Sequence, residues 1–98
     1  MAERLSGAMS IEDWRHKIDE IDRKLVELLN ERSRCAIEIG KIKHDLNLRV
    51  YDPERERQIL RRIKESNHGP LDDDGLQRLF EVVIDECRRI ERLEREKE

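Results

Sequence analysis

Aromatic residues, glycine and proline are all scarce in this sequence. Its 98 residues include one Trp, one Tyr, one Phe, four glycines and two prolines. This composition argues against a sandwich, a barrel or an α/β fold. Charged residues make up 46% of the chain, which is typical of long helices in contact with water. We therefore predict an all-α fold.

The sequence also lacks a block of charge of one sign and a long apolar run. Its 21 Lys and Arg are interleaved with 24 Asp and Glu, so no nucleic-acid footprint stands out. No run approaches the length of a transmembrane helix, and residues 1–9 contain no apolar signal-peptide segment. We expect a cytoplasmic protein that binds neither nucleic acid nor membrane.

Cysteine is rare, and its two positions indicate no metal site. Cys35 and Cys87 fall at apolar helical positions, so we expect reduced thiols of the core rather than a disulfide. Together with the three histidines they show no metal-ligand spacing. We expect no metal and no cofactor.

What the sequence does contain is a long periodic apolar stripe. We expect residues 1–10 to form a flexible tail and residues 11–95 to form one helical domain, with Ser10 as the N-cap of its first helix. From Ile11 to Leu46 the stripe recurs at alternating steps of three and four. A helix over these residues would be roughly 54 Å long, more than one small chain can cover. The stripe therefore predicts a partner chain.

Two shorter helices should follow, giving three per chain. Asp52 and Pro53 supply an N-cap and a proline at the first helical position, and this helix should end near residues 66–67. Asp72, Asp73 and Asp74 favour the start of the third helix, whose apolar stripe leads to Cys87 and Glu91. We expect the last residues, 92–98, to fray.

Cations interrupt the stripe of the first helix. Arg32 stands between Leu28 and Cys35, where an unpaired buried charge would be costly. Alone it would be interpreted as a snorkelling side chain or a register-setting ion pair. Lys43 follows three turns later on nearly the same face, and Arg15 shares a column with Lys43. Three inward-facing cations instead predict a local anion site.

The spacing of these cations predicts that the site is shared between two chains. Arg15 and Arg32 are 17 residues apart, or roughly 25 Å along one helix, and cannot hold one small ligand together. If two copies of the helix pack antiparallel, Arg15 of one chain comes level with the interval between Arg32 and Lys43 of the other. Two identical pockets per homodimer result.

Other candidate residues have more than one interpretation. Glu91 lies on an apolar face, where burial would raise its pKa and nearby cations would lower it, or else it lies on the surface near a helix end. Arg55 and Glu56 stand in the first turn after Asp52 and Pro53, where surface ion pairs are common. The residues alone leave these alternatives open.

Four segments of the sequence form a recognisable combination. They are Arg15-x-x-Ile18-Asp19-x-Ile21-Asp22, Leu28-Leu29-x-Glu31-Arg32, Ile39-Gly40-Lys41-x-Lys43 and Asp52-Pro53-Glu54-Arg55-Glu56. Together they resemble the all-helical, AroQ class of chorismate mutases. The similarity runs from about Ile11 to Leu93, and Arg78-Leu79-Phe80 marks the third helix.

The resemblance implies an intertwined, domain-swapped homodimer with two shared active sites. Such an enzyme is an intramolecular isomerase that converts chorismate to prephenate by a concerted Claisen rearrangement, a step of phenylalanine and tyrosine biosynthesis, and it uses no cofactor. By position, Arg32 and the partner's Arg15 would hold carboxylates, and Lys43 would donate to the ether oxygen and a carboxylate. Arg55 would line the pocket, and Glu56 with the Asp52 backbone would accept a hydrogen bond from the ring hydroxyl.

Two positions depart from the common pattern of that class. Cys87 stands where a serine often assists a carboxylate, and a thiol is the weaker donor. Glu91 replaces a glutamine that usually donates to the ether oxygen, so only its protonated form could take that role. Lys43, Glu91 and Arg32 are the predicted catalytic residues, and Cys87 is a predicted substrate contact.

Two other functions remain as alternatives at this point. One is an isochorismate pyruvate lyase of the same fold, against which the Asp-Pro-Glu-Arg-Glu run argues. The other is a non-enzymatic helical dimerisation module, for which loss of the Arg32 charge would be neutral or stabilising.

Overall fold

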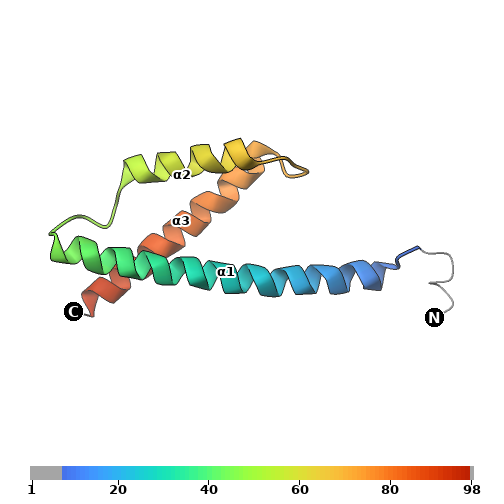
Figure 1. Ribbon diagram of the computed structural model, residues 1–98, viewed down its shortest axis with the longest axis horizontal. Coiled ribbons are helices and arrows are strands. Elements are labelled where there is room, and N and C mark those ends of the chain that lie inside the picture. The colour runs from blue at the N-terminus through green and yellow to red at the C-terminus, as the bar shows by residue number, and fades with distance from the viewer. Residues whose placement is uncertain (1–7, 98) are drawn as a thin grey trace. The chain divides into compact units, whose positions relative to one another are not determined.

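The computed structural model describes residues 8–97, which form three α-helices (Figure 1). They are α1 (Ile11–Asp45), α2 (Pro53–Ser66) and α3 (Asp73–Glu96). Residues 8–97 contain no β-strand, which confirms the all-α prediction. None of the helices in this range is long and apolar enough to cross a membrane. Residues 1–7 of the predicted tail lie outside the described range.

Local capping determines where α1 begins. The Asp13 N–H donates to Ser10 Oγ at 3.1 Å, and the Ser10 N–H donates to Asp13 Oδ2 at 2.9 Å. This reciprocal pair satisfies two N–H groups at the helix start. Glu12 and Asp13 also place negative charge at the positive end of the helix dipole. The predicted start at Ile11 is confirmed.

Asparagine ends α1 with a Schellman-type turn. Asn47 has φ = 60°, a left-handed conformation that Asn tolerates better than most residues. The Leu48 N–H donates to Lys43 O at 2.7 Å, and the Asn47 N–H donates to His44 O at 3.1 Å. The turn sends the chain back along α1, where Lys43 Nζ donates to Val50 O at 2.9 Å.

Aspartate N-caps begin the other two helices: Asp52 was predicted as an N-cap, and Asp72 is one of the three aspartates expected at the start of the third helix. Asp52 Oδ1 accepts from the Arg55 N–H at 3.1 Å, and Pro53 takes the first helical position. Asp72 Oδ1 accepts from the Gly75 N–H at 2.6 Å.

The predicted fraying of residues 92–98 is wrong up to Glu96, where α3 ends. Arg95 explains the extension, because its guanidinium donates to Leu48 O at 3.0 Å and to Gly40 O at 3.2 Å. These bonds join the last turn of α3 to α1 and to the connection that follows α1.

The chain divides into two units between Glu31 and Arg32. In the second unit α2 packs against α3, and a small core forms from Ile84, Cys87 and Glu91 of α3 with Gly40 of α1. In the first unit, apolar side chains of α1 such as Ile18 and Leu25 are about half exposed, at 54% and 50%.

The expectation that both cysteines are core residues is wrong for Cys35. Both thiols are free, but Cys35 is exposed and only Cys87 is buried. Within the second unit, the α1 residues that contact α3 include Ser33 and Gly40. Cys35 lies two residues, or about 200°, around the helix from Ser33, so it turns away from that contact.

Candidate functional site

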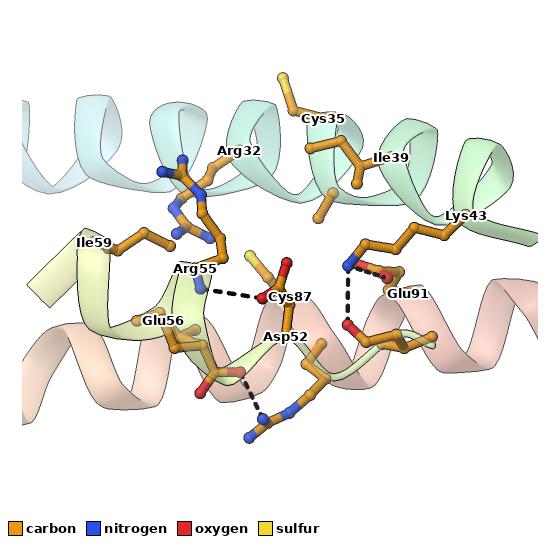
Figure 2. Close-up of a pocket in the computed structure, with 14 residues that line it drawn as sticks. Arg32, Cys35, Ile39, Lys43, Asp52, Arg55, Glu56, Ile59, Cys87 and Glu91 are labelled. Carbon is orange, nitrogen blue, oxygen red and sulfur yellow. Dashed lines mark hydrogen bonds and ion pairs between the residues drawn. The ribbon is translucent and has the colours of Figure 1, made fainter. Parts of the chain in front are cut away.

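A cavity of about 230 Å³ lies in the second unit, between the second half of α1, the start of α2 and α3 (Figure 2). Every predicted site residue except Arg15 lines it: Arg32, Lys43, Asp52, Arg55, Glu56, Cys87 and Glu91. Apolar walls come from residues such as Ile39, Ile59 and Ile84. The cavity is somewhat smaller than the roughly 300–1,000 Å³ of typical ligand pockets.

Arg15 belongs to the first unit and is not among the residues of this cavity. Its Nη1 pairs with Glu12 Oε1 at 2.9 Å, and 68% of its side chain is exposed. An exposed pair of this kind contributes little to stability. Arg15 is therefore available at little cost for another anion.

The cavity is cationic although the whole chain has a net charge of −3. Arg32, Lys43, Arg55 and Arg88 line it against three carboxyl groups. Figure 2 shows Arg32 and Arg55 extending into it from α1 and from α2. The Arg55 Nη1 donates to Gln58 Oε1 at 2.6 Å, which leaves further guanidinium donors for a ligand. The cavity therefore suits an anionic ligand.

Lys43 and Glu91 face each other across one end of the cavity (Figure 2). The two side chains are only 18% and 8% exposed, and Lys43 Nζ lies 3.7 Å from Glu91 Oε2. This separation permits an ion pair but exceeds a normal hydrogen bond. Within the described chain, Glu91 Oε2 is buried without a hydrogen-bond partner.

Burial has the largest effect on the pKa of Glu91. Desolvation raises the pKa of this carboxyl above its ordinary value, while the positive charges of Lys43 and Arg95 oppose the change only in part. Glu91 is thus easier to protonate than an exposed glutamate. A protonated carboxyl can donate a hydrogen bond, which the ionised form cannot do.

Glycine allows Glu91 to lie close against α1. A Cβ at Gly40 would stand 2.5 Å from Glu91 Cγ and 3.2 Å from its Cδ. The Cγ is the near end of the side chain and cannot move without moving the whole carboxyl.

We expect Gly40→Ala to lower the free energy of unfolding, by about 1 kcal/mol net. Overpacking of this kind costs about 1–3 kcal/mol, and the better helix propensity of alanine recovers up to about 1 kcal/mol. In a Glu91→Ala background the clash is gone, so Gly40→Ala should become stabilising. Urea unfolding at one protein concentration measures both effects. Equal effects in the two backgrounds would contradict this packing account.

Cys87 has a polar contact with α1. Its Sγ lies 3.7 Å from Ser33 Oγ of α1, and either atom is able to donate. Position 87 itself lacks the serine common in the resembled class, but the hydroxyl of Ser33 on α1 lies beside it. The spacing of residues along α3 does not show this arrangement.

Arg88 was missed by the sequence analysis. Its guanidinium donates to Glu56 Oε2 and to Asp85 Oδ1, both at 2.6 Å, and it lies 4.9 Å from the centre of the Tyr51 ring. Arg88 therefore holds Glu56 at the wall of the cavity. The only signal in the sequence is its place next to Cys87, because charged residues fill the exposed face of α3 throughout.

The model of the family "Chorismate mutase type II" matches residues 14–92, most of the chain. The chain belongs to this family. The resemblance seen in the sequence is thereby confirmed, and chorismate mutases are also found among its relatives and among structures of the same fold.

Two relatives illustrate the range of the family. The chain is 47% identical over 78 residues to the bifunctional chorismate mutase/prephenate dehydratase of Neisseria gonorrhoeae, covering 80% of this chain and 21% of that protein. It is 34% identical over 80 residues to the chorismate mutase of Methanocaldococcus jannaschii, covering 80% of each. The chain spans 21–25% of the length of the first four bifunctional relatives.

A solved chorismate mutase has the same fold. The crystal structure of the enzyme from Helicobacter pylori in complex with prephenate matches with a TM-score of 0.83 and 27% identity. The match covers 90% of this chain and 96% of that one.

Proposed function

We propose that this chain is a chorismate mutase, which converts chorismate to prephenate by a Claisen rearrangement. The cavity is the observation on which the proposal rests: it gathers Arg32, Lys43 and Arg55 around an apolar wall in an otherwise acidic protein. The M. jannaschii relative, matched over 80% of its length, is named a chorismate mutase, and the H. pylori neighbour was solved with prephenate. Both support the same reaction here.

The reaction requires positioning and charge stabilisation rather than a nucleophile. In one concerted step the ether C–O bond breaks while a C–C bond forms, and negative charge grows on the ether oxygen. A rigid donor beside that oxygen stabilises the transition state more than the ground state. Lys43 is suited to this role, because Val50 O holds its ammonium group and further N–H donors remain.

The other polar groups suit the remaining parts of the substrate. Arg32 and Arg55 present planar guanidinium forks, which match carboxylates well. Glu56 is held by Arg88 through Oε2, so its other oxygen is able to accept from the ring hydroxyl, together with the Asp52 backbone. Cys87 offers a weak donor at the floor of the cavity. The substrate would be held in a compact conformation near that of the transition state.

A second copy of the chain would complete the site. In the first unit, Trp14, Ile18, Ile21 and Leu25 are 53%, 54%, 48% and 50% exposed. Full burial of an exposed side chain of this size stabilises by about 1.5–3 kcal/mol, and burying the half that is still exposed would contribute roughly half of that for each residue, so a helix of this kind favours a partner. We propose a domain-swapped homodimer in which the partner's Arg15 enters the cavity and helps Arg32 to hold a carboxylate.

The direct test follows the absorbance of chorismate after addition of purified protein. We expect chorismate to disappear and prephenate to accumulate, with no cofactor added. Isochorismate supplied in parallel should release no pyruvate. Pyruvate release from isochorismate with chorismate unchanged would assign the lyase reaction instead, and no reaction with either compound would leave only a dimerisation module.

Activity should depend on pH through Glu91. Only the protonated carboxyl can donate to the ether oxygen, so we expect kcat/KM to fall as pH rises through the pKa of Glu91, which burial raises. Glutamine donates at every pH, so Glu91→Gln should stay active and lose most of this dependence. The two profiles should be compared from about pH 4.5 to 8.5, where circular dichroism shows both folded. Parallel decline of both profiles, or an inactive Glu91→Gln, would show that Glu91 is not the donor.

A further inference from the structure

Arg95 connects the end of α3 to both sides of the Lys43 region. Its Nη1 donates to Leu48 O at 3.0 Å, and its Nη2 donates to Gly40 O at 3.2 Å. The guanidinium is partly buried, and its Nε is buried without a hydrogen-bond partner in the described chain. A long, flexible side chain held by two separate main-chain carbonyls is restricted to a narrow range of positions.

The two carbonyls belong to residues that contact Lys43 and Glu91. The Leu48 N–H donates to Lys43 O at 2.7 Å, so Leu48 is held by Lys43 on one side and by Arg95 on the other. Gly40 lies one turn before Lys43 and is the residue against which the Glu91 side chain packs. Glu91 in turn lies one turn before Arg95 in α3. Arg95 is thus connected to Lys43 through Leu48 and to Glu91 through Gly40.

We propose that Arg95 is a positioning residue that sets the separation of Lys43 and Glu91 by joining Gly40 and Leu48 through one guanidinium. The proposal rests on the function proposed above. It requires both the fork of donors and the positive charge of arginine, and these two properties are separable by mutation.

The charge of Arg95 also bears on Glu91, which is surrounded by other ionisable groups. From α1, Lys43 and Arg32 line the same cavity, and the start of α2 contributes Asp52, Arg55 and Glu56. From α3 come Cys87, Arg88 and Arg95, and a second, smaller pocket beside Glu91 adds Lys41 of α1 and Glu94 of α3. The charges of Lys43 and Arg95 are the ones that lower the pKa of Glu91 against the effect of burial.

Two substitutions distinguish the role of the two-pronged guanidinium of Arg95 from the role of its positive charge. Arg95→Lys keeps the charge but cannot bridge two carbonyls, and Arg95→Gln keeps a donor but removes the charge. We expect both to lower kcat by ~10- to 100-fold, because small misplacements of catalytic groups have effects of this size. Arg95→Gln should also raise the pKa of Glu91, whereas Arg95→Lys should leave it near the wild-type value. Arg92→Ala, an exposed arginine of the same helix, is the matched control and should change neither.

The titration of Glu91 should be followed by NMR of its carboxyl carbon as well as by the pH profile of kcat/KM. The NMR readout holds even if the wild-type protein has no mutase activity, so failure of the proposed function is distinguishable from failure of this proposal. Wild-type kcat in Arg95→Lys, or an unchanged Glu91 titration in Arg95→Gln, would overturn the proposal. So would loss of the fold in both variants, which would assign Arg95 a purely structural role.

Discussion

Replacing Lys43 with alanine should lower kcat by on the order of 10²-fold or more and change KM far less. Loss of one donor aimed at developing charge typically has an effect of this size. The ammonium group is preorganised by Val50 O at 2.9 Å, so its contact with the ether oxygen strengthens as the C–O bond breaks. Steady-state kinetics with chorismate separate the two constants.

A neighbouring lysine supplies the control for this variant. Lys41 lies on α1 two residues before Lys43, pairs with Glu38 at 2.9 Å and is 54% exposed. Lys41→Ala should leave both constants near their wild-type values. An unchanged kcat with a raised KM in Lys43→Ala would make Lys43 a substrate-binding residue without a specific role in the transition state.

Mixing two inactive variants should restore activity if the sites are shared. In a dimer of Arg15→Ala with Arg32→Ala, one cavity receives an intact Arg32 and the partner's intact Arg15, while the other cavity lacks both. With free exchange half of the dimers are mixed, so we expect roughly a quarter of wild-type activity. Sedimentation at micromolar concentration should show a dimer throughout.

The structure provides a sharp negative control for this experiment. Arg32 and Lys43 line the same cavity of one chain, so a dimer of Arg32→Ala with Lys43→Ala contains no intact site. That mixture should recover nothing. Equal recovery in the two mixtures, or none in the first despite verified exchange, would contradict the shared site.

The starts of the three helices could be predicted from the sequence because capping is local. Ser10, Asp52 and Asp72 each bond to an N–H three residues ahead, and Pro53 stands where its missing N–H costs nothing. The spacing of Arg32 and Lys43 along the first helix predicted one anion site, and the family resemblance alone added Arg55 and Glu56, which line the same cavity. These features depend on residues that are close together in the sequence, or on family motifs that can be recognised in the sequence itself.

Contacts between helices could not be predicted in the same way. The apolar stripe of α1 suggested a core position for Cys35, yet α3 packs on the face of Ser33 and Gly40 instead. Glu56 and Arg88 are 32 residues apart, and many other charged pairs would have fitted the sequence equally well. Because charged residues occur along every helix, their pattern in the sequence does not specify which of them form ion pairs between helices.

By itself, therefore, the sequence determined three helices, where each of them begins, and a cationic face on α1, because hydrogen-bonded caps and helical periodicity act over a few residues. Only the tertiary structure decided that Glu91 is buried against Gly40, that Lys43 stands 3.7 Å from it, and that Arg95 joins α3 to the end of α1. The physical reason is that burial and long-range hydrogen bonds depend on which helix faces meet. That choice follows from the fit of whole surfaces, down to the space left by one missing Cβ.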